Sequence, residues 1–186
     1  ARVRQSTQFI VGAADETDRQ IVEATFGLYR RLGLSRVYYS AYQAGLGDPS
    51  LPGERRPKQR FEQDPPGDRR AGGEDILTRE HRLYQVDFLI RKYGFDAGEI
   101  PFQPDGNLSL AGDPKTLWAA AHPERFPVDV NRADRRALLR VPGLGPIGVA
   151  RILALRQGGG RLRRLSDLGP VGSRLRKAGA YLKFGY

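Results

Sequence analysis

The chain has 186 residues, 39% of them hydrophobic, and a formal net charge of +10 at pH 7. That length fits one or two domains with a folded core. It contains no cysteine, which excludes disulfides and thiolate metal sites within it, and its two histidines, His81 and His122, are too far apart in sequence to favour zinc. We therefore expect no metal ligands. No apolar run approaches the length of a membrane span and no signal-peptide pattern occurs, so we expect a cytoplasmic protein without membrane contact.

The positive charge is concentrated in the last third of the chain. Residues 124–186 hold 14 Lys and Arg against 4 Asp and Glu, whereas residues 1–123 hold 17 of each. A basic domain beside a neutral one is typical of proteins that bind a polyanion. The change in charge predicts two domains, residues 1–122 and 131–186, joined by a linker at 123–130.

The front half begins with a strand, a helix and a second strand. Residues 8–12 form a short apolar run, residues 18–32 have helical spacing after Asp15 or Thr17 as a cap, and residues 36–42 are β-branched and aromatic. This order predicts a βαβ unit with parallel strands. Because a parallel sheet needs both faces covered, we expect further strands from outside the chain. The first residue is not methionine, and we expect a piece of a longer protein.

A long connection follows the second strand. Residues 45–76 are rich in proline, glycine and arginine, which predicts a loop. We expect a helix from Thr78 to Tyr93, and a short helix that opens at Asp113–Pro114 and carries Trp118.

The last third centres on the run Val-Pro-Gly-Leu-Gly-Pro at 141–146, between amphipathic segments at 131–140 and 147–156. This layout predicts two helices joined by a tight hairpin, with positive φ accessible to both glycines and Pro146 at the first helical position. Free N–H groups and the positive dipole end of the second helix suit a phosphate. The candidate DNA-contacting residues are Arg140, Pro142, Gly143, Leu144, Gly145, Pro146, Ile147, Gly148, Arg151, Arg174 and Lys177.

Residues 165–173 repeat this hairpin imperfectly, with glycines spaced G-x-x-G instead of G-x-G. We interpret the repeat as completing a small helical core. Asp167 lies at the spacing of the catalytic Asp in DNA glycosylases of the hairpin–Gly/Pro–Asp type, but it is better interpreted as a helix cap.

The pattern Asn131-x-Ala133, Leu138-Leu139, Pro142-Gly143-Leu144-Gly145 and Ala150 resembles the helix-hairpin-helix module of competence-type DNA uptake and repair proteins, up to Leu182. The resemblance implies that the hairpin amides bind DNA phosphates without reading the base sequence.

The front half has a second resemblance. Residues 8–17 are similar to the fifth strand and following turn of radical SAM barrels, and residues 36–42 to the sixth and last strand. Residues 79–85 and 125–134 resemble the DNA modification/repair radical SAM proteins linked to uracil-DNA glycosylase, which end in a helix-hairpin-helix domain. The expected fold is thus α/β followed by all-α: the last βαβ unit of a partial (β/α)6 radical SAM-type barrel, then a small helix-hairpin-helix domain.

This resemblance implies S-adenosylmethionine and a 4Fe–4S cluster for a full-length parent enzyme. The family's C-x-x-x-C-x-x-C loop is absent here, so we expect this chain alone to bind neither group and to be inactive. The residues that would border the adenosyl site are Ile10, Gly12, Tyr38, Tyr39 and Ser40. The implied partners are DNA and, in addition, either the missing N-terminal part of the barrel or a uracil-DNA glycosylase-like protein.

The functional prediction is sequence-nonspecific DNA binding by the C-terminal part of a radical SAM DNA modification/repair protein. The alternative is a stand-alone helix-hairpin-helix accessory protein that binds DNA or another protein without catalysis.

Overall fold

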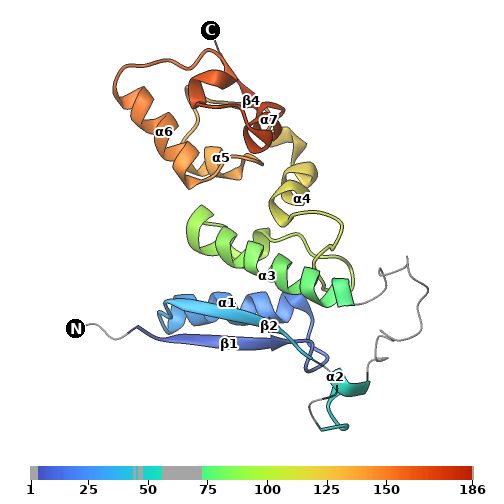
Figure 1. Ribbon diagram of the computed structural model, residues 1–186. Helices are drawn as coiled ribbons and strands as arrows, with labels where there is room; N and C mark the ends of the chain where they lie inside the picture. Colours follow the sequence, from blue (N-terminus) through green and yellow to red (C-terminus); the bar gives the residue numbers. More distant parts are fainter. Residues whose placement is uncertain (1–3, 44, 46–47, 56–72, 186) are drawn as a thin grey trace. The chain divides into compact units, whose positions relative to one another are not determined.

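The computed structural model describes residues 4–43, 45, 48–55 and 73–185 (Figure 1). The chain divides into two compact units. The first comprises Ala1–Ile90 and Asp96–Pro114, and the second comprises Arg91–Phe95 and Lys115–Tyr186. Residues 46–47 and 56–72 of the expected loop at 45–76 lie outside the described residues. The described part of this loop contains the short helix α2 (Pro52–Arg55).

The first unit contains the expected βαβ arrangement. Strands β1 (Ser6–Val11) and β2 (Arg36–Ala41) pair in parallel and are connected by helix α1 (Asp18–Arg31). Thr17, not Asp15, caps α1: its side chain accepts from the N–H of Gln20, and the Gln20 side chain accepts in return from the N–H of Thr17.

Helix α3 (Gly73–Tyr93) begins five residues before the expected start, so Thr78 lies inside it. The unit also contains a 3-10 turn, η1 (Ala97–Glu99).

Helices α1 and α3 both contact one face of the sheet. Tyr39 of β2 is buried there; its hydroxyl lies 3.0 Å from that of Thr25 in α1, and its ring meets Tyr84 of α3 edge-on. The opposite face remains uncovered within the described residues, where Ile10 and Tyr38 each keep 47% of their surface exposed.

The two edges of the sheet differ. The outward N–H groups of β2 donate to side chains of α1 and α3, at 2.8–3.1 Å: Val37 to Tyr29, Tyr39 to Tyr84, and Ala41 to Glu80. Along the outer edge of β1, no acceptor among the described residues meets the N–H groups of Ser6, Gln8 and Ile10. The β2 edge is therefore closed by side chains, and the β1 edge is open.

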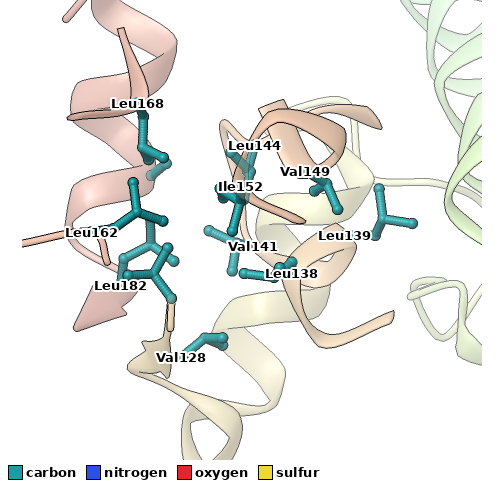
Figure 2. Close-up of a cluster of buried hydrophobic side chains, with 12 residues drawn as sticks. Val128, Leu138, Leu139, Val141, Leu144, Val149, Ile152, Leu162, Leu168 and Leu182 are labelled. Carbon is teal, nitrogen blue, oxygen red and sulfur yellow. The ribbon is translucent and has the colours of Figure 1, made fainter. Parts of the chain in front are cut away.

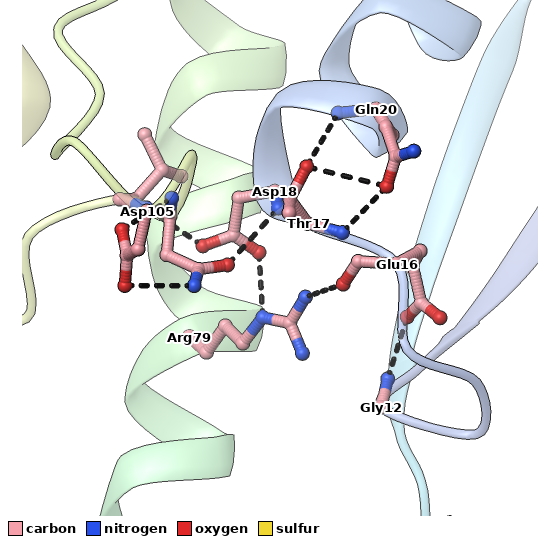
Figure 3. A network of polar contacts seen from close by, with 9 residues as sticks. Gly12, Glu16, Thr17, Asp18, Gln20, Arg79 and Asp105 are labelled. Carbon is pink, nitrogen blue, oxygen red and sulfur yellow. Dashed lines mark hydrogen bonds and ion pairs between the residues drawn. The ribbon is translucent and has the colours of Figure 1, made fainter. Parts of the chain in front are cut away.

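A buried ion pair fixes the start of α1 (Figure 3). Asp18 is fully buried and accepts from Arg79 Nε at 2.6 Å and from the N–H of Leu108 at 2.8 Å. Arg79 also donates to the carbonyl of Glu16. Because both carboxylate oxygens are hydrogen-bonded, the desolvation cost of this buried charge is offset.

The second unit is built mainly from short helices. Its elements are α4 (Pro114–Ala121), η2 (Pro123–Arg125), β3 (Val128–Asp129), α5 (Arg135–Arg140), α6 (Pro146–Gln157), η3 (Leu165–Leu168), α7 (Ser173–Gly179) and β4 (Leu182–Lys183). Strands β3 and β4 pair in parallel over two residues.

The core of this unit gathers apolar side chains from nearly every element (Figure 2). Leu138 and Leu139 of α5 and Ile152 of α6 are buried together with Leu168 of η3 and Ala178 of α7. The imperfect repeat thus contributes to one common core. These buried surfaces are the main source of stability for such a small unit.

The expected linker at 123–130 is part of the folded unit. Val128 and Val130 are buried in the core, and the N–H of Val128 donates to Tyr181 O at 2.8 Å. The alternation of apolar and polar residues at 128–130 is the pattern of a short strand, which the neighbouring prolines obscured.

Candidate nucleic-acid interface

Residues 141–146 connect α5 and α6, and we call them the α5–α6 hairpin. Asp134 caps α5 by accepting from the N–H of Ala137 at 2.7 Å, as the sequence predicted. The hairpin closes with a hydrogen bond from the N–H of Leu144 to Val141 O, and α6 begins at Pro146 with Gly145 as its N-cap. Two short helices and a tight turn therefore stand where they were expected.

Gly143 serves packing within the unit. Its φ is +80°, and a Cβ at this position would lie 2.2 Å from Arg174 O and 2.9 Å from the nitrogen of Ala178, both in α7. Only glycine allows the hairpin to approach the α7 backbone this closely. The sequence predicts Gly143 as a DNA contact, but in the structure the space beside it is filled by the protein itself.

Gly145 does not use the left-handed region that the sequence pattern suggested. Its φ is −105° and its ψ is 174°, an extended conformation that any residue adopts. A Cβ here would meet only the hydroxyl of Tyr93, at 3.4 Å. Because Gly145 has no side chain, it leaves the N–H groups at the start of α6 accessible.

The first turn of α6 presents unsatisfied donors. Gly145 provides no side-chain cap, and the first backbone bond of the helix runs from the N–H of Val149 to Gly145 O. Within the described part of the chain, no acceptor meets the N–H groups of Ile147 and Gly148. These N–H groups add to the positive dipole end of a twelve-residue helix.

A buried lysine lies behind the hairpin. Lys115 of α4 is only 7% exposed; its Nζ donates to Leu144 O at 2.6 Å and lies 4.4 Å from the ring centre of Tyr93. The Leu144–Gly145 peptide is planar and trans, so its N–H points away from the carbonyl that Lys115 holds. Sequence reasoning missed Lys115, although a cation in the first turn of a helix is an unusual choice.

Arg140, a predicted DNA contact, is a core residue. It is 3% exposed and donates to Tyr93 O at 2.9 Å and Gly94 O at 3.0 Å, two carbonyls at the end of α3. Its guanidinium centre also lies 3.7 Å from the ring centre of Phe95. The last carbonyls of a helix lack intrahelical donors, and Arg140 supplies them. The prediction that it contacts DNA is therefore wrong for this arrangement.

The other predicted contacts separate into buried and exposed groups. Pro142 and Leu144 are buried, whereas Arg174 and Lys177 of α7 are exposed. Arg151 is exposed, but its Nη1 donates to Leu168 O at 2.9 Å and so ties α6 to η3. Pro146 and Gly148 are partly exposed at the start of α6.

The charge contrast between the two units is larger than the expected boundary implied. The second unit holds 17 Lys and Arg against 4 Asp and Glu, a net charge of +13, and the first unit holds 14 against 17, a net charge of −3. Most of these cations are exposed: Lys92, Arg125, Arg132, Arg135, Arg136, Arg151, Arg161, Arg163, Arg164, Arg174, Arg176, Lys177 and Lys183.

The five residues expected at an adenosyl site are only partly brought together. Ile10 pairs with Ser40, and both lie with Tyr38 on the uncovered face, whereas Tyr39 points to the opposite, buried face. Gly12, which follows β1, is buried and is covered by α2.

Helix α2 approaches the end of β1 closely. The N–H of Gly53 donates to Ala13 O at 3.0 Å, and a Cβ at Gly53 would lie 2.7 Å from Gly12 O. The carboxyl end of β1 is thus occupied by the chain itself.

Asp167 has the environment of a cap. Its Oδ2 accepts from the N–H groups of Arg163 and Arg164 at 2.8 and 3.1 Å. The hydrogen bond from Arg163 is the main cause that lowers the pKa of Asp167 below its ordinary value. This geometry supports the capping interpretation over the glycosylase one.

Each of the two histidines contacts a residue four positions away in the sequence. The ring of His122 stacks on Trp118 and its Nδ1 lies 2.8 Å from Trp118 O, while His81 is hydrogen-bonded to Gln85. Among the described residues, no group of three or more His, Asp or Glu is placed to hold a metal ion. Nor is any described helix both long and apolar enough to cross a membrane. In comparisons with known proteins, no family model, no curated protein and no solved structure matches this chain.

Proposed function

We propose that the second unit binds the phosphate backbone of DNA, without reading its sequence, through the α5–α6 hairpin acting as a helix-hairpin-helix module. The observation that carries the proposal is the pair of unsatisfied N–H groups of Ile147 and Gly148 at the start of α6, on a unit with a net charge of +13. Backbone donors at a helix N-terminus suit a phosphate oxygen, and contacts to phosphate carry no direct sequence information.

The aromatic residues of this unit favour backbone binding over recognition of single-stranded bases. The ring of Phe126 meets those of Trp118 and Tyr181 edge-on, with ring centres 6.4 and 5.1 Å apart, and Trp118 is buried. Binding of single strands relies on exposed aromatic rings that stack on bases. A unit with many exposed cations is instead suited to the phosphates of a duplex.

The proposal also includes the context that the second resemblance implies, a C-terminal position in a radical SAM DNA modification/repair protein. The sheet edges support it: β2 is closed as a last strand would be, and β1 has an open edge for a preceding strand. The alternative, an accessory protein without catalysis, is favoured by the position of α2 against Gly12, where the adenosyl group would bind.

The hairpin is tested by Gly145→Asp in the full chain. Asp is a preferred N-cap, its Cβ has room, and its carboxylate would accept from the free N–H groups that we assign to phosphate. We expect a melting temperature at least equal to that of the wild type and at least tenfold weaker binding to a random-sequence duplex, measured by fluorescence anisotropy.

Gly172→Asp is the matched control, because Gly172 is the N-cap of α7 and a Cβ there meets nothing within 4 Å. It changes the net charge equally and should weaken binding much less. Equal losses for both variants would mean that only net charge matters, and unchanged binding by Gly145→Asp would exclude the hairpin as the phosphate site.

A further inference from the structure

The start of α6 exposes an isoleucine beside its free N–H groups. Ile147 is 89% exposed, more than any other large hydrophobic side chain in the described part of the chain. Single exposed hydrophobic residues are common on protein surfaces and need no explanation by themselves. What distinguishes Ile147 is its position, because its own N–H is one of the two unsatisfied donors.

The residues next to these donors in the sequence are uncharged. Gly148 has no side chain, Ala150 is exposed, and Arg151, one turn further along, directs Nη1 to Leu168 O. An anion bound by the N–H groups of Ile147 and Gly148 would therefore have an aliphatic side chain as its neighbour. The cations that attract it would come largely from elsewhere, including Arg174 of α7, whose backbone adjoins Gly143.

We propose that Ile147 packs against the deoxyribose next to the phosphate that the hairpin binds. This inference rests on the function proposed above. The net charge of +13 favours binding of a polyanion. An aliphatic side chain beside the N–H donors further favours a polyanion in which phosphates alternate with carbon-rich groups. In DNA each phosphate lies between two sugar carbons. In inorganic polyphosphate the same place holds another hydrated, charged phosphate, against which Ile147 gains nothing.

The test compares Ile147→Ala with Leu155→Ala in the full chain. Leu155 lies two turns further along the same helix and is 42% exposed, so both variants remove three carbons from an exposed side chain. For Ile147→Ala we expect roughly tenfold weaker binding to duplex DNA, because each buried methylene changes affinity by several-fold. The slope of log affinity against log salt should not change, since no charge is removed. Affinity for inorganic polyphosphate should also stay constant.

Leu155→Ala should match the wild type with both ligands, and melting temperatures measured by circular dichroism should agree among the three proteins. If Ile147→Ala binds duplex DNA as tightly as the wild type, Ile147 serves another surface, such as a protein partner, and this inference is overturned while the proposed function stands. An equal loss on DNA and polyphosphate would also overturn it, because the contact would then not involve sugar. If the wild type itself does not bind DNA, the proposed function fails, and this inference with it.

Discussion

Lys115 Nζ donates to the carbonyl oxygen of Leu144 at 2.6 Å, across 29 residues of sequence, from a site where the lysine is nearly buried. The same contact orients the Leu144–Gly145 peptide and places a positive charge behind the α5–α6 hairpin. It connects the helix that precedes the expected domain boundary to the candidate DNA-binding loop.

Replacing Lys115 by methionine keeps a similar apolar stem and removes the donor. The free energy of unfolding should fall by about 2 kcal/mol, because Leu144 O is left buried without its charged partner. DNA affinity should fall as well, beyond any unfolded fraction, because the hairpin peptide loses its orientation and nearby charge. Urea unfolding and fluorescence anisotropy measure the two effects, and Lys115→Arg, which retains a donor, should lose less in both. Full DNA affinity in a folded Lys115→Met protein would show that this contact supports only the fold.

Replacing each hairpin glycine by alanine should change the stability of the second unit by very different amounts. Gly143→Ala forces a Cβ against the α7 backbone in a left-handed conformation, and it should destabilise the second unit by more than about 2 kcal/mol. Gly145→Ala meets only the Tyr93 hydroxyl and should change stability little. Thermal unfolding of both variants checks this; similar melting temperatures would contradict the packing described for Gly143.

Substitutions at Arg140 and Arg174 should affect different properties, the first the stability of the protein and the second its binding to DNA. Arg140→Ala leaves two helix-terminal carbonyls and the ring of Phe95 without their cation and should cost roughly 2–4 kcal/mol of unfolding free energy. Arg174→Ala removes an exposed charge, so it should leave stability unchanged and reduce the salt slope of DNA binding by about 1 from a wild-type slope near −3. Chemical denaturation measures the change in unfolding free energy, and titration of DNA binding with salt measures the change in slope. A reduced salt slope in folded Arg140→Ala would restore Arg140 as a phosphate contact.

Features that depend on neighbouring residues could be predicted from the sequence, and features that depend on distant residues could not. Local signals sufficed for the caps at Thr17 and Asp134, for the parallel strands and for the layout of α5, hairpin and α6, because each depends on residues a few positions apart. The burial of Arg140 depends on Gly94 and Phe95, more than forty residues earlier, and Lys115 reaches Leu144 in the same way. Side-chain type alone favours the surface for a lysine or an arginine, which is why Arg140 was predicted to contact DNA and Lys115 was not singled out. The backbone angle of Gly145 was missed because a glycine permits a positive φ without requiring one.

Asp167 predicts a specific pH dependence. Its pKa is lowered in the folded state, so its stabilising contribution is present above the ordinary value of 3.8 and is lost as the pH falls through the lower folded value. Asp167→Asn should therefore lower the melting temperature at neutral pH, and the difference from the wild type should shrink as the pH falls below 4. Thermal unfolding between pH 7 and pH 3 measures the difference. A difference that stays constant over this range would mean that the charge of the carboxylate is not what the cap requires.

The unequal edges of the two-stranded sheet give the last prediction. The N–H groups of Val37, Tyr39 and Ala41 are hydrogen-bonded to side chains of α1 and α3, whereas those of Ser6, Gln8 and Ile10 meet no acceptor among the described residues. Amide hydrogen exchange followed by NMR should therefore be slow along the outer edge of β2 and fast along that of β1.

The substitution Tyr84→Phe tests the closure of the β2 edge at a single residue, Tyr39. The Tyr84 hydroxyl accepts from the N–H of Tyr39 and donates to Tyr39 O, so its removal should accelerate exchange at Tyr39 more than at Ala41, which Glu80 holds. Fast exchange on both edges of the wild type would mean that the side chains do not close β2. Slow exchange at Ser6, Gln8 and Ile10 would mean that β1 already has a partner in solution, such as a second copy of the chain. The open edge would then give no support to a preceding barrel strand, since the position it would occupy is taken.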